Sequence, residues 1–272
     1  MRLHGSEIAR VVKAFPTLLR VGVSETVAFR MAFLIWILTA TQPLVMMSLM
    51  TFIARGQGFR GYSAPAFIAY YLAALIVRQL TGSWVSSRMT EEIRMGTLAM
   101  RLLRPIHPFY TFLASQLAAI PLRAAISVVL AAILLATSGA ATLPHDLTQL
   151  VLAPISITLS WLISFSVFFT IGSLALFLTE TTALGTAYFA LFSLFSGYLM
   201  PLDTLPQPIP VLAGWLPFKF MLAVPVMVMT RELPITTCLH MLGGQLVWVA
   251  LTLALARWTW HRGIKRFESV GS

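Results

Sequence analysis

The sequence predicts an all-α integral membrane protein, and its composition and the length of its apolar runs carry this prediction. Hydrophobic residues make up 58% of the 272 positions and charged residues 10%, whereas a typical soluble domain carries about 25% charged residues. The apolar runs exceed 20 residues without alternating with polar ones, which favours helices over the strands of a barrel. Little polar chain remains for a soluble catalytic domain, so we expect one membrane domain over 1–272.

Six apolar segments are long enough to cross a bilayer, which requires about 20 helical residues. The first lies among the 24 uncharged residues between Arg30 and Arg55, and the fourth among the 33 between Asp146 and Glu180. The others are expected at 64–85, 109–137, 182–201 and 233–256. The fourth segment is longer than a bilayer needs, so we expect it to tilt or to include an interfacial turn.

Residues 6–20, SEIARVVKAFPTLLR, have the pattern of an amphipathic helix. Apolar side chains from Ile8 to Leu19 share one face, and Arg10, Lys13 and Arg20 share the other. This pattern is typical of a helix that lies in the membrane interface with its basic face toward anionic headgroups. We expect Pro16 to kink it. A loose basic tail is the alternative.

The stretch RMTEEIRMGTLAMRLLRP, residues 88–105, is among the most charged in the chain. On a helix over 89–104, an apolar side contains Ile93, Gly96, Met100 and Leu103, and an opposite side contains Glu91, Arg94 and Arg101. Pro105 ends the pattern. A short amphipathic helix between two spans is suited to bind a soluble protein.

The distribution of basic residues predicts the orientation. Thirteen Lys and Arg residues lie in the N-terminal segment, the 88–104 loop and the C-terminal tail, against four in the opposite loops. The positive-inside rule therefore places both termini, the 88–104 loop and Glu180 in the cytosol. Because the charges lie in short loops, we expect contacts with anionic lipids and no nucleic acid.

Residues 201–234 are apolar but contain seven prolines, which makes an uninterrupted spanning helix unlikely. We expect 201–231 to form short helices that enter the outer leaflet and return, packed against the rest of the protein. A poorly ordered outer loop is the alternative, although the apolar composition disfavours it.

No residues of a nucleotide-binding site are present. The lysines are Lys13, Lys219 and Lys265, and none follows the glycines of a P-loop. If ATP drives this protein, ATP and Mg²⁺ are bound by a partner chain, and we expect no cofactor in this one. Its single cysteine, Cys238, excludes an internal disulfide, and no histidines have metal-ligand spacing, so we expect no metal site.

Two charged residues, Arg78 and Arg123, fall inside predicted spans, whereas no Asp or Glu does. An arginine at that depth costs at least a few kcal/mol unless it is paired or hydrated. Its partner could be water, backbone carbonyls, lipid phosphate or an anionic cargo. Arg78 could also reach the cytosolic headgroups by snorkelling, so structural and pathway roles stay open for both. The lack of an intramembrane carboxylate argues against a secondary carrier.

Together these features resemble the permease subunits of type-2 ATP-binding-cassette exporters. The most specific stretch is EEIRMGTLAMRLLRPIHPFYTFLA, residues 91–114, which is similar to the acidic-Ile-Arg-x-Gly-x-Leu … Leu-Leu-x-Pro signature of a bacterial branch of this family. The resemblance implies two permeases, identical or related, around a pathway in the bacterial inner membrane. A dimer of cytosolic ATPases would dock beneath them. Family members export drugs, lipids, glycans or peptides.

The resemblance also implies residue roles. The 89–104 helix would be the coupling helix that enters a groove on the ATPase, with apolar contacts from Ile93, Gly96, Met100 and Leu103 and an ionic rim of Glu91, Glu92, Arg94 and Arg101. ATP-driven closure of the ATPases would open a path along the second and fifth spans by alternating access. The candidate pathway residues are Arg78, Arg123, Tyr188, Phe192, Phe195 and Tyr198. The four aromatic residues could equally serve ordinary packing.

Three other functions remain as alternatives: a membrane-embedded enzyme such as a protease or lipid transferase, a secondary carrier, and a non-transporting scaffold. A protease would need a serine and a histidine that face each other at depth. Ser196 near the end of the fifth span and His240 near the start of the sixth are weak candidates, because the nucleophile glycine pattern is absent.

Overall fold

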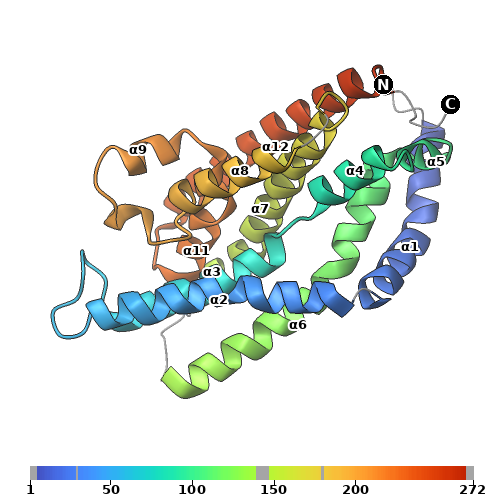
Figure 1. Cartoon of the computed structure of the whole chain (residues 1–272). Helices are drawn as coiled ribbons and strands as arrows, with labels where there is room; N and C mark the ends of the chain where they lie inside the picture. Colours follow the sequence, from blue (N-terminus) through green and yellow to red (C-terminus); the bar gives the residue numbers. More distant parts are fainter. Residues whose placement is uncertain (1–4, 29, 139–146, 179–180, 268–272) are drawn as a thin grey trace.

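The computed structural model describes residues 5–28, 30–138, 147–178 and 181–267 (Figure 1). Every regular element in these ranges is a helix. In chain order they are α1 (Gly5–Ala28), α2 (Arg30–Ile53), α3 (Ala64–Thr81), α4 (Val85–Arg94), α5 (Leu98–Leu102), α6 (Pro108–Ser138), α7 (Leu147–Leu174), α8 (Thr182–Phe195), the 3-10 helix η1 (Leu202–Thr204), α9 (Ile209–Gly214), α10 (Pro217–Met221), α11 (Ala223–Thr230) and α12 (Ile235–Ile264).

The helices agree in position with the predicted spans. Four helical stretches of the described part are long and apolar enough to cross a membrane, namely Ala64–Arg94, Pro108–Val129, Val151–Leu174 and Ile235–Ile264. Two shorter apolar helices, Thr41–Ile53 and Thr182–Phe195, lie where the first and fifth spans are expected. The count of six spans stays a prediction.

Helix α7 is at the centre of the bundle. It packs against α12, α4, α3, α10 and α11, while α2 packs on α3 and α1 on α6. The largest group of buried apolar side chains joins α3 and α7 to α8 and α11 and includes Phe67, Ile163, Phe192 and Val226. The chain therefore buries its core around α3 and α7, and leaves apolar faces of α2 and α12 outward, where Phe52 and Leu246 are exposed.

The contact between α4 and α7 is especially close because it forms at Gly172. A Cβ on Gly172 would lie 3.0 Å from the Cβ of Met89 and 3.1 Å from the Cα of Ser86. Such distances are shorter than ordinary van der Waals contacts, so the two helices approach closely only because residue 172 has no side chain.

The molecule has two opposite ends (Figure 1). The beginning of α1, helices α4 and α5, and the end of α12 lie at one end, which we call the inner end. The α2–α3 connection and α9 lie at the opposite end, the outer end. This arrangement groups the same three segments that the basic residues place on one side of the membrane, although the cytosolic location of the inner end stays a prediction.

The N-terminal helix is longer than expected. The amphipathic pattern covers 6–20, but α1 continues to Ala28. Near its end it packs on α6 at Gly22, where a Cβ would lie 2.8 Å from the Cβ of Ala118. Contact with α6 therefore extends the helix beyond the amphipathic pattern, and its location in a membrane interface stays a prediction.

Residues 201–231 form η1 and three short helices, α9, α10 and α11. The expectation that the prolines prevent one long helix is confirmed. The stretch 221–226 is buried, and α11 packs against both α3 and α7. The later part of the segment is therefore covered by protein, whereas its earlier part, with Val211, Leu212 and Trp215, is exposed. Whether it enters a bilayer stays a prediction.

Candidate functional site

The predicted coupling helix over 89–104 is not one helix. The chain forms α4, which ends at Arg94, and α5, which begins at Leu98. Between them Gly96 has a φ of +71°, a left-handed conformation that glycine adopts at little cost and other residues rarely adopt. The prediction of a continuous helix is therefore wrong, and the side assignments made by helical periodicity do not extend across 95–97.

Part of the predicted ionic rim lies inside the fold. The Arg101 guanidinium forms a two-pronged ion pair with Glu92, with Nε donating to Oε2 at 2.8 Å. It also donates to the Thr111 hydroxyl at 2.8 Å and lies 4.4 Å from the centre of the Phe112 ring. These contacts connect α4, α5 and the start of α6. Ile93 likewise packs against a buried cluster that includes Met89 and Leu98.

A smaller set of side chains at the inner end is exposed. Glu91 and Arg94 face outward, and three apolar side chains are largely exposed: Met95 (63%), Met100 (67%) and Leu103 (80%). We call these five residues the coupling face. The helical pattern did not identify Met95, because the left-handed turn at Gly96 changes the direction in which neighbouring side chains point. An exposed apolar group rimmed by charges is typical of a protein-binding site.

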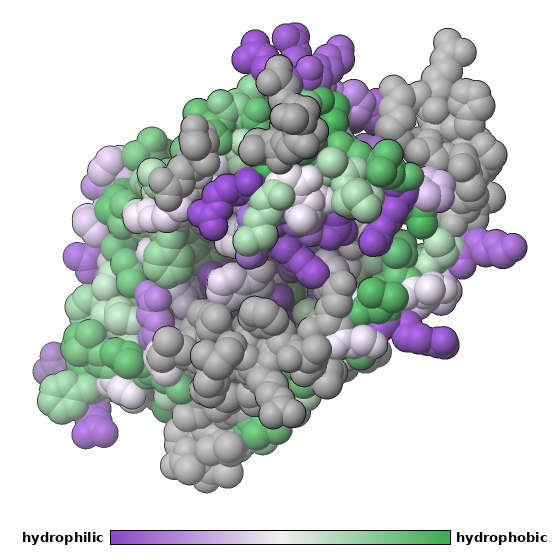
Figure 2. Space-filling model, turned by 45° about the vertical axis from the view of Figure 1, so that its right-hand side comes forward, coloured by the Kyte–Doolittle hydropathy of each residue, from purple (hydrophilic) through white to green (hydrophobic). Residues whose placement is uncertain are grey.

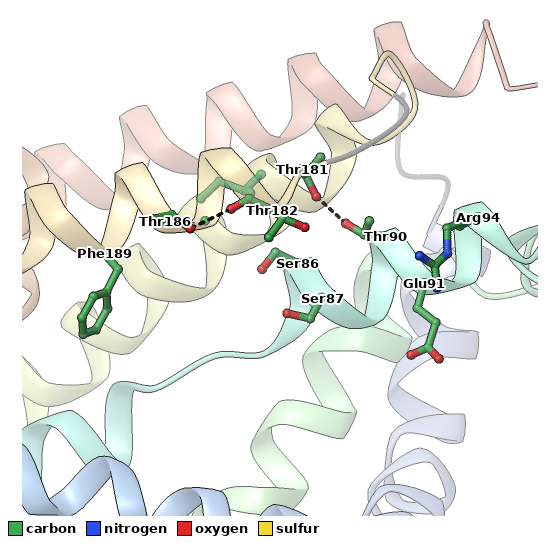
Figure 3. A pocket seen from close by; sticks show the side chains of 11 residues that line it. Ser86, Ser87, Thr90, Glu91, Arg94, Thr181, Thr182, Thr186 and Phe189 are labelled. Atoms are coloured by element: carbon green, nitrogen blue, oxygen red, sulfur yellow. Dashed lines mark hydrogen bonds between the residues drawn. The ribbon is translucent and has the colours of Figure 1, made fainter.

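Beside the coupling face, a groove of about 560 Å³ lies between α4, α7 and α8 (Figure 3). Most of its lining surface is apolar, although six of its eleven lining residues bear hydroxyl groups; the other five are Ile171, Gly185, Phe189, Glu91 and Arg94. The hydroxyl-bearing residues are Ser86, Ser87, Thr90, Thr181, Thr182 and Thr186. Figure 2 turns the inner end toward the viewer and shows hydrophilic side chains gathered in the middle of this face.

A hydrogen bond of 2.8 Å between the Thr90 and Thr181 hydroxyls joins α4 to the residue that precedes α8 (Figure 3). The groove therefore lies between α4, which follows the second predicted span, and the start of the fifth, and none of the six candidate pathway residues lines it. The path along the two spans stays a prediction. Sequence reasoning missed the hydroxyls of the groove, because they belong to two short clusters far apart in the chain. The one signal in the sequence is that the first of these clusters directly precedes the predicted coupling loop.

The second predicted span is interrupted at 82–84, and both intramembrane arginines reach this interruption. Arg123 on α6 is 3% exposed and donates a hydrogen bond to the carbonyl of Gly82. Measured from the position that a Cβ on Gly82 would occupy, an Nη1 atom of Arg123 lies at 3.7 Å and one of Arg78 at 3.9 Å. We call Arg78 and Arg123 the arginine pair.

Aromatic rings of the fifth span cover one side of the arginine pair. The Arg78 guanidinium lies 5.1 Å from the centre of the Phe192 ring and 5.8 Å from that of Tyr198, distances at which cations and aromatic faces attract. Phe192 in turn lies 5.8 Å from Tyr188 and 5.7 Å from Tyr198, measured between ring centres. Five of the six candidate pathway residues thus form one group; Phe195 packs both against the cluster that contains Tyr188, Phe192 and Tyr198 and against Leu202 and Ala213.

The fifth helix is shorter than predicted, and this changes how Tyr198 is positioned. α8 ends at Phe195 rather than near Pro201, and Gly197 has a φ of +84°. The Tyr70 hydroxyl donates to the Gly197 carbonyl at 2.6 Å, and the Tyr71 hydroxyl to that of Leu199 at 2.7 Å. Two tyrosines of α3 therefore hold the chain in a turn, and this turn brings Tyr198 back onto Phe192.

At the outer end, a polar cluster joins the α2–α3 connection to the 201–231 segment. The Tyr62 hydroxyl donates to Asp203 at 2.9 Å, Arg231 forms an ion pair with Asp203 and also contacts Tyr62, and Arg60 donates to the Thr204 carbonyl at 2.8 Å. Burial raises the pKa of Tyr62 well above its usual range, so its phenol stays neutral. We call Tyr62, Asp203 and Arg231 the outer cluster.

The weak protease candidates do not form a site of the expected kind. Ser196 is fully buried, whereas His240 is exposed on α12. A nucleophile and its base must lie within hydrogen-bonding reach of each other and of a substrate. The geometry gives this alternative no support.

The fold and these features define a class, a helical multi-pass membrane protein with a groove that contains many hydroxyl groups next to an exposed patch of apolar and charged side chains. The sequence model of the family described as "ABC-2 family transporter protein" matches residues 37–271. The chain belongs to this family, as the resemblance indicated, and is a permease subunit of an ABC transporter. The matched range begins within α2 and includes both arginines of the pair, the groove and the coupling face. Among curated proteins, none matches the sequence.

Proposed function

We propose that this chain is the membrane subunit of an ATP-driven exporter in the bacterial inner membrane. Both termini lie in the cytosol, a second copy or a related permease completes the pathway, and a dimer of cytosolic ATPases binds at the coupling face. Family membership supports the ATPase partner, because members usually work with one. The direction of transport rests on the likeness to exporters.

One observation carries this proposal: the coupling face and the groove share helix α4. Glu91 and Arg94 are exposed toward the coupling face and also line the groove. Helix α4 is also packed on α7 at Gly172. A force applied to α5 therefore reaches the groove wall directly through the Glu92–Arg101 ion pair.

In the proposed cycle, ATP binding brings the two ATPases together and displaces α5 and α4. The interruption at 82–84 lets α4 change its angle while α3 stays packed in the core, where Leu75 and Val77 are fully buried. The groove between α4 and α8 changes width as a result. This is alternating access driven at one end of the bundle.

The test is co-purification with the ATPase encoded nearest to this chain. The double variant Met100→Ser/Leu103→Ser removes the apolar part of the coupling face, and exchanging Glu91 with Arg94 reverses its charges. We expect both to lower ATPase association at least tenfold, because central apolar contacts dominate interface energies. Trp215→Ser is the matched control, since Trp215 is as exposed as Leu103 (80%) but follows α9 at the outer end. Undiminished association and ATP turnover in both variants would remove the assignment.

A further inference from the structure

The arginine pair has an unusual electrostatic environment. Two guanidinium groups approach the same point beside Gly82, and like charges in an environment of low polarity repel each other. The ion pairs found in the described ranges join Glu92 to Arg101 and Asp203 to Arg231, and neither involves Arg78. Arg78 has the rings of Phe192 and Tyr198 beside it, and its Nε is buried with no hydrogen-bond partner.

A purely structural role accounts for only one member of the pair. Arg123 donates to the Gly82 carbonyl and so satisfies a backbone acceptor where the span is interrupted, which is a sufficient reason for a buried arginine. Arg78 hydrogen-bonds instead to the side chain of Tyr198. Its ring contacts offset part of the cost of a charge at this depth, and they leave a donor aimed at no acceptor. A negatively charged group at this position would compensate both arginines.

The side chains around the arginine pair also indicate which chemical group would be attached to a bound anion. Tyr198 lies 6.4 Å from Phe189, measured between ring centres, and Phe189 lines the groove. The arginine pair is therefore connected to the groove through aromatic rings. On the other side, Tyr188 packs on Phe168 and Phe218 at 4.7 and 5.8 Å. A ligand that fits both features has a compact anionic head and an apolar tail.

We propose that the arginine pair binds the anionic headgroup, a phosphate or a carboxylate, of an amphiphilic cargo whose tail lies against Phe189, Phe192 and Tyr198. This inference rests on the proposed function and names its substrate class. Arg78 and Arg123 supply the charge, and the aromatic rings exclude water from the contact. The start of α4 adds the positive end of a helix at the same interruption.

The experiment compares three probes on the purified full chain in detergent micelles by native mass spectrometry. Lysophosphatidic acid has an anionic head and a tail, lysophosphatidylcholine has the same tail with a zwitterionic head, and inorganic phosphate has no tail. We expect lysophosphatidic acid to bind at least tenfold tighter than lysophosphatidylcholine, because a hydrogen bond to a charged group contributes about 1.5–3 kcal/mol. Equal binding of the two lipids would overturn the proposal. Equal binding of inorganic phosphate and lysophosphatidic acid would overturn the amphiphile assignment.

Variants locate the site. Arg78→Gln should abolish the preference for the anionic lipid, Arg78→Lys should retain most of it, and Arg55→Gln, which removes an exposed arginine near the outer end, should leave it unchanged. A preference that survives in Arg78→Gln would overturn the proposal. If Arg78→Gln does not fold, the unmodified chain is labelled with a lysophosphatidic acid that has a photoreactive tail. Labelling of peptides within 182–200 supports the site, and labelling confined to other peptides overturns it.

These outcomes are separable from those of the coupling test, because lipid binding needs no ATPase. Loss of ATPase association on mutating the coupling face tests the proposed exporter and leaves the lipid preference unchanged. A chain that binds its ATPase normally but shows no preference for the anionic lipid would keep the proposed function and lose only the substrate class.

Discussion

The outer and inner ends of the bundle differ in whether their side chains are bonded to one another or exposed to the surroundings. At the outer end, Tyr62, Asp203 and Arg231 bond to one another, so polar groups from distant parts of the chain satisfy each other. At the inner end, Met100 and Leu103 point into the surroundings next to charged side chains. The charged groups of the outer end are therefore paired within the chain, although Trp215 is exposed there, whereas the inner end presents exposed apolar and charged side chains together, a surface that another protein can complete.

Two of the turns with left-handed glycines, at Gly96 and Gly197, show the same contrast. Gly197 is buried, and its carbonyl accepts a hydrogen bond from Tyr70. Gly96 is half-buried and lies between the two exposed methionines, Met95 and Met100. One turn is fixed by the core, and the other is positioned to respond to a partner. The following predictions test this contrast, from the largest expected effect to the smallest.

Gly197→Val should have the largest effect on stability. The variant forces a β-branched residue into a φ of +84° and places a Cβ 2.5 Å from the Tyr70 hydroxyl oxygen. We expect a loss of about 3 kcal/mol or more, from backbone strain and overpacking together. Thermal unfolding of the purified chain in detergent measures it. Gly214→Ala, where a Cβ meets nothing within 4 Å, is the control. Equal melting temperatures for the two variants would contradict a core-fixed turn.

Glu92→Ala should destabilise the inner end by about 2 kcal/mol. The two side chains of this ion pair are only 16% and 19% exposed, and removing one partner leaves a poorly solvated charge. The double variant Glu92→Ala/Arg101→Met should recover part of the loss, because it removes the stranded charge as well. A double-mutant cycle on unfolding free energies measures the coupling. No recovery in the double variant would indicate that Arg101 acts mainly through its contact with Phe112.

Tyr62→Phe should cost about 1 kcal/mol, the usual net contribution of a hydrogen bond. The effect should depend on pH in a defined direction. Burial raises the pKa of Tyr62, so its contribution is fully present below the unfolded value of about 10 and is lost as pH rises through the folded value. The difference in unfolding free energy between wild type and Tyr62→Phe should therefore narrow above about pH 10. A difference that stays constant to pH 11 would show that the phenol does not titrate with unfolding.

Met100→Ser/Leu103→Ser should have the smallest effect on stability, within about 0.5 kcal/mol, since both side chains are exposed and make few contacts. Chemical unfolding of the isolated chain checks this. A large loss of stability would show that these side chains already pack within the chain, and the contrast between the two ends would then fail.

The positions of the long helices could be predicted because each needs an uninterrupted apolar run and the charges mark where the runs end. The positions at which the helices are interrupted could not be predicted. Gly96 and Gly197 lie inside helical patterns, and nothing in the local sequence tells a left-handed glycine from a helical one. The bonds that fix Tyr198 come from Tyr70 and Tyr71, which are more than a hundred residues away. The sequence identified the arginines as unusual, but only the packing of α6 against α3 and the turn after α8 bring them together with the aromatic rings.

Gly172 affects the width of the groove between α4, α7 and α8. It follows Ile171, which lines the groove, and it faces Ser86, which lines the opposite wall. The spacing of those walls is thus set by a single missing methyl group. Alanine at this position would force the walls apart by a fraction of an ångström, and a larger residue by more. If cargo passes through this groove as proposed, a change of one codon would alter the size of molecule that fits, without any alteration of a group that touches the cargo.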